Sequence, residues 1–165
     1  MRPEQGTMQS RAQAMAALLE VLTDQPVIIS NGFPSREAQK LADRPTHFYM
    51  IGSMGNAAAI GLGVALSKPS KKVIVFDGDG NVLMGMGTLA TVGALRPKNF
   101  VHVVFDNEVY GSTGNQPTIS NVVQLEKVAK AAGYVVVERV LDREDLVYEF
   151  KDMLKNDGPS MLLVK

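Results

Sequence analysis

The stretch Val73-Ile74-Val75-Phe76-Asp77-Gly78-Asp79-Gly80-Asn81 joins a run of apolar residues to a turn of glycine and polar residues. Its apolar half is typical of a strand that is buried on both faces of a parallel sheet. A second stretch of this kind, Val101-His102-Val103-Val104-Phe105-Asp106-Asn107, places Asn107 at 28 positions after Asp79. Adjacent parallel strands end at the same edge of a sheet, so we expect Asp79 and Asn107 to lie close together where such folds bind ligands.

These two side chains carry the hard oxygen atoms that Mg²⁺ takes from a protein when a diphosphate and water supply its other ligands. Gly78 and Gly80 allow a tight turn and a close approach of the backbone to phosphate. We expect a helix to open near Asn81, and its first N–H groups would then be directed at an anion. The sequence therefore predicts a magnesium and diphosphate site at this edge of the sheet.

Strand and helix patterns alternate along the whole chain. The apolar patterns predict strands at 26–29, 48–51, 73–76, 101–105, 135–138 and 161–164, and helices at 11–22, 35–41, 56–66, 84–95, 122–131 and 143–154. This alternation predicts one three-layer α/β/α domain, residues 1–165, around a mostly parallel six-stranded sheet. The polar, glycine-containing segment 106–120 has the length of a functional or mobile loop, and we expect residues 1–10 to be a flexible end.

Composition excludes several classes of protein. The chain has 17 basic and 17 acidic residues without a basic run, which argues against a nucleic-acid partner. It has no cysteine, which excludes disulfides and thiolate metal sites and is compatible with the cytoplasm, where we expect the protein to be. No run of 18 apolar residues occurs, so we expect no membrane-spanning helix.

The pairing of Gly78-Asp79-Gly80 with Asp106-Asn107 resembles the signature of thiamine-diphosphate-dependent enzymes, which have Gly-Asp-Gly and Asn-Asn at this spacing. The resemblance implies the thiamine-diphosphate-binding fold, with Mg²⁺ held by Asp79, Asn107 and the backbone carbonyl of Val109. Asp106 departs from the pattern, which has asparagine there. This position is not an expected metal ligand, so we expect the charge of Asp106 to influence the metal ligands from outside the coordination sphere.

A second segment, Ile51-Gly52-Ser53-Met54-Gly55-Asn56, resembles the part of thiamine-diphosphate decarboxylases that contacts the aminopyrimidine ring. The resemblance implies that the Gly52 carbonyl accepts a hydrogen bond from the ring and that Met54 wedges the cofactor into a bent shape. In such enzymes the protein orients the cofactor, and the cofactor itself carries out the chemistry. The further cofactor-binding residues that the resemblance implies are Asn31, Gly32, Ser53, Gly78, Gly80, Asn81, Tyr110 and Gly111.

Three stretches narrow the resemblance to the sulfopyruvate and phosphonopyruvate decarboxylase group: 52–55, 97–100 and 111–118. The earlier stretch 31–37 also fits the turn on the phosphate side in that group. This resemblance implies a diphosphate-binding subunit of a split decarboxylase, which converts a 2-oxo acid such as 3-sulfopyruvate or phosphonopyruvate to an aldehyde and CO₂. A pyrimidine-domain subunit would supply the activating glutamate, in a hetero-oligomer; the isolated chain would form a homodimer. Ser112, Thr113 and Gln116 are expected near the substrate or over the cofactor.

Other interpretations remain beside this one. Carboligation of the acetolactate synthase type uses the same cofactor site, and a non-catalytic thiamine-diphosphate-binding module needs no chemistry at all. A 2-oxo acid oxidoreductase subunit is weaker, because the chain offers no cysteine for an iron–sulfur cluster. A calcium loop at 77–88 fails, because Val82 and Thr88 replace the glycine and glutamate that it requires. His102, within an apolar strand, is expected to be structural, and Met84 and Met86 are expected to fill the core.

Overall fold

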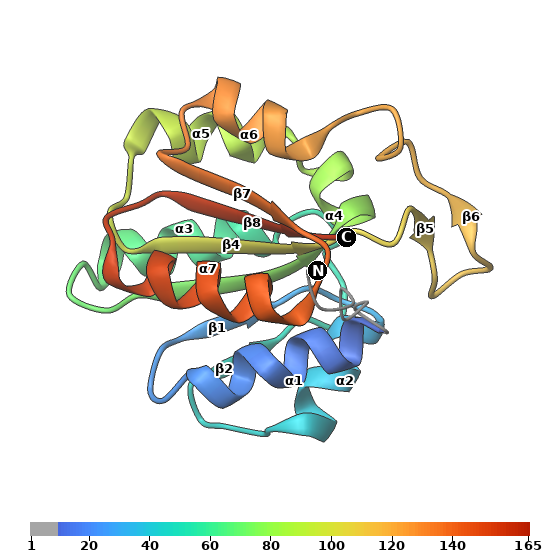
Figure 1. Cartoon of the computed structure of the whole chain (residues 1–165), viewed down its shortest axis with the longest axis horizontal. Coiled ribbons are helices and arrows are strands. Elements are labelled where there is room, and N and C mark those ends of the chain that lie inside the picture. Colours follow the sequence, from blue (N-terminus) through green and yellow to red (C-terminus); the bar gives the residue numbers. More distant parts are fainter. Residues whose placement is uncertain (1–9) are drawn as a thin grey trace, which may run out of the picture.

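The computed structural model describes residues 10–165, which form a parallel sheet with helices on both faces (Figure 1). Six strands lie in the order β2-β1-β3-β4-β8-β7, and every neighbouring pair is parallel. Their bounds are β1 Val27–Ile29, β2 His47–Tyr49, β3 Val73–Gly78, β4 Phe100–Phe105, β7 Val136–Val140 and β8 Ser160–Val164. The predicted three-layer fold is therefore confirmed, and all six predicted strands are present.

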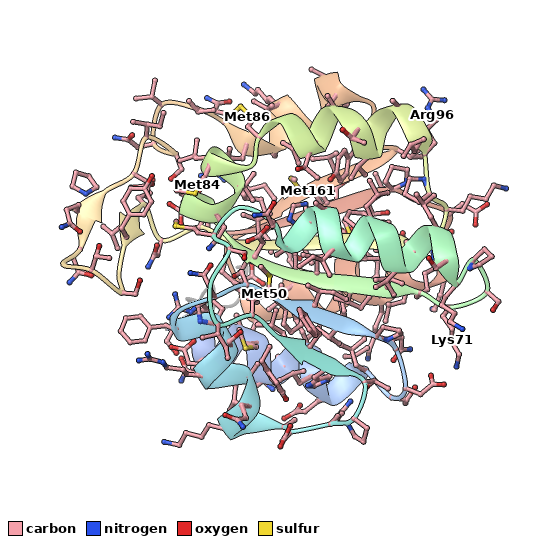
Figure 2. All side chains as sticks on the ribbon, turned by 180° about the vertical axis from the view of Figure 1, so that it is seen from behind. Met50, Lys71, Met84, Met86, Arg96 and Met161 are labelled. Atoms are coloured by element: carbon pink, nitrogen blue, oxygen red, sulfur yellow. The ribbon has the colours of Figure 1, made fainter. Side chains whose placement is uncertain are left out.

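Helices cover the two faces of this sheet in two groups. The first group is α1 (Arg11–Val21), α2 (Phe33–Leu41) and α7 (Arg143–Lys155), whose buried side chains share one hydrophobic cluster. The second group is α3 (Ala57–Ser67), α5 (Gly87–Leu95) and α6 (Leu125–Ala132), which share the other. In Figure 1 α7 lies in front of the sheet, whereas Figure 2, seen from behind, has α3 in front.

The central strand β3 has no alternation of polar and apolar residues, because both of its faces are buried. Ile74 and Phe76 pack into the cluster under α1 and α7, whereas Val73 and Val75 pack into the cluster under α3 and α5. All four side chains are completely buried, and each contributes about 1.5–3 kcal/mol of hydrophobic free energy. A strand between two helical layers has no solvent face, so the apolar run is continuous.

The predicted helix at 84–95 is instead two helices. A short helix, α4, spans Asp79–Met84, and α5 begins at Gly87, so Gly85 and Met86 lie at the break. A Cβ atom at position 85 would lie only 2.0 Å from the carbonyl oxygen of Gly55, which explains why the chain has glycine there. Met84 was predicted to lie in the core, and this is wrong, since it is 64% exposed at the end of α4 (Figure 2).

The predicted loop at 106–120 contains a small antiparallel hairpin, β5 (Val109–Tyr110) and β6 (Gln116–Pro117), which projects beside α4 (Figure 1). The following helix begins at Leu125 rather than at 122. The predicted flexible end lies outside the described residues except for Ser10, which caps α1 by accepting a hydrogen bond from the Gln13 N–H. Within residues 10–165, no helix has the length and apolar character needed to cross a membrane.

His102, on β4, connects two other buried side chains, Asp77 on β3 and Tyr134 in the segment before β7. Its Nε2 atom lies 3.2 Å from Oδ2 of Asp77, and its Nδ1 atom lies 3.3 Å from the Tyr134 hydroxyl. Burial raises the pKa of Tyr134 above its usual value, and the charge of Asp77 adds to this effect. His102 therefore has the structural role that the sequence predicts.

Replacing His102 by leucine is expected to lower the free energy of unfolding by about 3–5 kcal/mol, because Asp77 would keep a buried charge without its partner. Urea denaturation followed by circular dichroism measures this loss. The double variant Asp77→Asn/His102→Leu removes the charge as well and should recover much of the stability. A loss below about 1 kcal/mol in His102→Leu would contradict the assignment, since that is no more than an ordinary hydrogen bond contributes.

Candidate functional site

The register of β3 and β4 places the two sequence motifs side by side. Gly78, the last residue of β3, pairs with Phe105, the last residue of β4. Asp79 and Asp106 therefore leave the sheet from adjacent strand ends, and Asn107 follows one residue later. This is the carboxyl edge of a parallel sheet, the usual place for ligands in such folds.

One pocket at this edge collects most of the predicted site residues. It is lined by Arg11, Asn31, Phe33, Pro34, Met54, Gly78, Asp79, Gly80, Asn81, Phe105, Asn107, Val109, Tyr110, Gly111 and Ser112. All three predicted metal ligands are among them. Gly32 lies in an adjoining cavity that shares Asn31 and Ser112 with this pocket.

Asp79 is only 3% exposed, and two hydroxyl groups lie against one of its carboxylate oxygens. Thr118 Oγ1 donates to Oδ2 at 2.5 Å, and Ser120 Oγ lies 3.2 Å from the same atom. Burial raises the pKa of Asp79, and the nearby charge of Asp106 raises it further, whereas the Thr118 hydrogen bond opposes both effects. A cation beside this carboxylate would remove the electrostatic penalty of its buried charge.

Asp106, the departure from the family pattern, has its own partners. Its Oδ1 atom accepts from Ser120 Oγ at 2.7 Å, and its Oδ2 atom lies 2.8 Å from Nζ of Lys165. Lys165 Nζ also lies 2.6 Å from Glu108 Oε1. Burial lowers the pKa of Lys165, but its hydrogen bonds to Asp106 and Glu108 outweigh burial and raise the pKa above its usual value. The extra negative charge at position 106 is thus balanced within the fold.

The backbone turns after Asn107, and both Asn107 and Val109 line the pocket. Asn107 Oδ1 accepts from the Val109 N–H at 3.2 Å, in a turn in which Glu108 takes a positive φ of 63°. Pro117 stands opposite Val109 across the hairpin. The Thr118 N–H donates to the Glu108 carbonyl, and hydrogen-bonded pairs alternate with non-hydrogen-bonded pairs in an antiparallel hairpin, so the Val109 carbonyl is not bonded to the facing strand.

The segment that the resemblance assigns to the aminopyrimidine lies against α4. The Gly55 N–H donates to Asn81 Oδ1 at 3.0 Å, in a buried contact. A Cβ atom on Gly80 would lie 2.5 Å from the Tyr110 ring and 3.4 Å from the Met54 methyl group, so Met54 and Tyr110 converge over Gly80. Gly52 and Ser53 do not line the pocket and lie on the exposed turn before Met54.

Two of the predicted substrate residues lie apart from the pocket. Thr113 Oγ1 donates to Gln116 Oε1 at 2.7 Å, and both side chains are exposed on the hairpin. Ser112 alone of the three lines the pocket.

The structure adds four residues that the sequence analysis missed. Thr118, Ser120 and Lys165 contact Asp79 or Asp106, as described above. Arg11 lines the pocket from the start of α1, where its guanidinium forms two hydrogen bonds with Glu37, at 2.8 and 2.9 Å. Thr118 ends the stretch 111–118 that carries the family resemblance, and both Thr118 and Ser120 lie in the polar segment 106–120, but neither was singled out. Arg11 and Lys165 had no signal in the sequence.

The family model for the C-terminal TPP-binding domain of thiamine pyrophosphate enzymes matches residues 31–164. The chain belongs to this family. Thiamine pyrophosphate is another name for thiamine diphosphate. The match runs from the end of β1 to the end of β8 and includes every predicted metal ligand.

Two curated relatives of this thiamine pyrophosphate domain are similar over most of the chain. It is 47% identical to a phosphonopyruvate decarboxylase from Streptomyces viridochromogenes, over 95% of this chain but 40% of the relative. It is 44% identical to sulfopyruvate decarboxylase subunit beta from Methanothermobacter thermautotrophicus, over 92% of this chain and 79% of the relative. The chain thus spans less than half of the phosphonopyruvate decarboxylase and most of the beta subunit.

A solved structure has the same thiamine pyrophosphate fold. It is a putative thiamin diphosphate-dependent enzyme from Mycobacterium smegmatis, which superposes with a TM-score of 0.78 at 21% identity over 98% of this chain and 32% of that chain. At this level of identity the comparison supports the fold alone.

The residues around the pocket fit thiamine diphosphate and a divalent cation. The Asn31 Oδ1 atom is buried and has no hydrogen-bond partner among the described residues, and Gly78 and Gly80 border the same pocket. Within residues 10–165 no group of three or more histidine, cysteine or acidic side chains is arranged so that it could hold a metal ion by itself. The oxygen donors at this pocket are one carboxylate, one amide and one carbonyl, which suits Mg²⁺ that takes its other ligands from phosphate and water.

Proposed function

We propose that the chain is the diphosphate- and Mg²⁺-binding subunit of a split thiamine-diphosphate-dependent 2-oxo acid decarboxylase. The observation that carries the proposal is that Asp79, Asn107 and Val109 line one pocket at the ends of β3 and β4. These three groups would hold Mg²⁺. Family membership supports thiamine diphosphate as the cofactor.

The chain's own contribution to the reaction is binding and orientation. Bound thiamine diphosphate supplies the electron sink that the departing carboxylate group requires. Asn31, Gly78 and Gly80 would border the diphosphate, and Asn81 fixes the neighbouring turn through the Gly55 N–H. Met54 would support the bent cofactor, and Gly52 would offer its carbonyl to the aminopyrimidine ring.

We propose 3-sulfopyruvate or phosphonopyruvate as the substrate, since the named relatives are decarboxylases of these acids. Of the three predicted substrate residues, Ser112 would contact the substrate, because it lines both the pocket and the adjoining cavity. Thr113 and Gln116 would approach the substrate only if the β5–β6 hairpin closed over the pocket.

A second chain is proposed to complete the site. No glutamate among residues 10–165 lines the pocket, so the activating glutamate would come from a pyrimidine-domain subunit. The extent of the match to a protein named subunit beta supports a hetero-oligomer. We propose a cytoplasmic location, with which the lack of cysteine is compatible.

Co-expression with a candidate pyrimidine-domain subunit tests the proposal. CO₂ release would be measured from 3-sulfopyruvate, phosphonopyruvate and pyruvate, with thiamine diphosphate and Mg²⁺ present. Release that requires both chains, with one anionic acid preferred over pyruvate, is the expected result. Binding of the cofactor without CO₂ release from any acid would overturn the decarboxylase assignment.

Product analysis separates the alternative functions. A decarboxylase yields aldehyde and CO₂, whereas carboligation of the acetolactate synthase type yields a product with a new carbon–carbon bond. A non-catalytic thiamine-diphosphate-binding module would leave the activity of the partner subunit unchanged when this chain is omitted. Either result would replace the proposed reaction but keep the cofactor site.

A further inference from the structure

Two buried hydroxyl groups bridge the two carboxylates behind the proposed metal site. Thr118 and Ser120 come from the end of the hairpin segment, and their hydroxyl oxygens lie 3.0 Å apart. Thr118 reaches Asp79 across 39 sequence positions, and Ser120 reaches Asp106 across 14. All four side chains are buried, so each hydrogen bond matters for the placement of its carboxylate.

The number of protons determines which carboxylate each hydroxyl serves. A hydroxyl group has one proton to donate, and an ionised carboxylate has none. Thr118 Oγ1 lies 2.5 Å from Asp79 Oδ2, and Ser120 Oγ lies 2.7 Å from Asp106 Oδ1, against 3.2 Å from Asp79. The shorter distances assign the Thr118 proton to Asp79 and the Ser120 proton to Asp106.

The same two residues contact Asp79 directly and also contact the residues that precede the other two proposed metal ligands. The Thr118 side chain holds Oδ2 of Asp79, and no side chain among residues 10–165 donates to the other oxygen, Oδ1. Besides these hydroxyl groups, Asp79 interacts with the Gly80 backbone N–H. The Thr118 backbone N–H donates to the Glu108 carbonyl at 2.8 Å, one residue before Val109. Ser120 holds Asp106, one residue before Asn107.

We propose that Thr118 and Ser120 are positioning residues for the metal, which fix Asp79 through one oxygen and leave the other for the cation. The inference rests on the proposed function, because it takes Asp79, Asn107 and Val109 as the ligands. Hydrogen bonds behind metal ligands orient them and raise metal affinity. Lys165 completes the arrangement by balancing the charge of Asp106. Ser120 then bridges two carboxylates, of which only that of Asp79 would face the cation.

The test is Mn²⁺ binding to the co-expressed two-chain enzyme at saturating thiamine diphosphate. The concentration of free Mn²⁺ is measured by electron paramagnetic resonance. Thr118→Val keeps the shape of the side chain but removes the hydroxyl, and it should weaken Mn²⁺ binding about 10- to 100-fold. Thr118→Ser keeps the hydroxyl and is the matched control; its affinity should stay within about 3-fold of the wild type, since the Asp79 hydrogen bond remains. The melting temperature without metal would be measured for both variants.

Three outcomes decide the question. Equal Mn²⁺ affinity of Thr118→Val and wild type overturns the inference, and so does equal weakening in Thr118→Ser, which would assign the effect to packing of the methyl group. If Thr118→Val fails to fold, Ser120→Ala takes its place, and an unchanged affinity in that variant overturns the inference. A two-chain enzyme with the wild-type chain that binds no Mn²⁺ in the presence of thiamine diphosphate would overturn the proposed function itself, which distinguishes the two failures.

Discussion

Replacing Asp79 by alanine is expected to lower kcat/KM for CO₂ release by the two-chain enzyme at least about 1,000-fold, or on the order of 4 kcal/mol. Asp79 is the one acidic side chain among residues 10–165 that lines the pocket. Its removal would leave an amide and a carbonyl as the protein ligands, neither of which carries a charge. The loss of metal would take the diphosphate anchor with it, so cofactor binding should fall together with activity.

Two further variants make this result specific. Asp79→Asn keeps the size of the side chain and removes its charge, so it should lose metal affinity while the melting temperature without metal stays near that of the wild type. Asp157→Ala is the matched control, since Asp157 is 69% exposed and precedes β8 at the opposite edge of the sheet. Activity of Asp79→Ala within about 10-fold of wild type would contradict the ligand assignment, because so small a loss corresponds to only 1.4 kcal/mol.

The fold follows from the sequence because its strands are buried on both faces. Continuous apolar runs such as 73–76 and 101–105 indicate parallel strands between helical layers, and the structure contains them as β3 and β4. The short strands at the edge are less well defined. The predicted strand 48–51 ends at Tyr49, and Ile51, an apolar residue, is 99% exposed. Its hydrophobicity alone does not show that it lies beyond the sheet.

The site was predictable only where residues are close in sequence to strand ends. Asp79 and Asn107 directly follow buried strands, so topology alone brings them together. Thr118 contacts Asp79 across 39 sequence positions, and Lys165 contacts Asp106 across 59. These contacts depend on the tertiary positions of the hairpin and of the end of β8. The charge of Asp106 therefore appeared uncompensated in the sequence, and Lys165 compensates it in the structure.

The break between α4 and α5 has a similar cause. Residues 84–95 carry a helical pattern of apolar residues, and glycine inside such a pattern costs only about 1 kcal/mol relative to alanine. The apolar pattern does not reveal that the backbone of Gly55 packs directly against position 85. A contact between two backbones that are distant in sequence, rather than helix propensity, determines where α4 ends.

Gly85→Ala is accordingly expected to lower the free energy of unfolding by about 3 kcal/mol, the upper end for a forced shift in a packed region. The melting temperature of a chain of this size should fall by about 10 °C. The new Cβ would lie 2.0 Å from the Gly55 carbonyl oxygen and 2.9 Å from its carbon, both of which are backbone atoms that no rotamer change can move. The 52–55 turn would separate from α4 and stretch the hydrogen bond between Gly55 and Asn81.

In Gly85→Ala, cofactor binding should weaken together with stability. Met54, which lines the pocket, belongs to the turn that the new Cβ displaces. Gly87→Ala is the matched control: two residues further on, a Cβ at that position meets nothing within 4 Å. It should melt at or slightly above the wild-type temperature and bind thiamine diphosphate with unchanged affinity, since alanine favours helix over glycine by up to about 1 kcal/mol. Scanning calorimetry and cofactor titration of the two variants measure both effects. Equal melting temperatures for Gly85→Ala and Gly87→Ala would show that the turn at 52–55 can move at no cost in stability. Equal cofactor affinities would show that its contact with α4 does not position Met54.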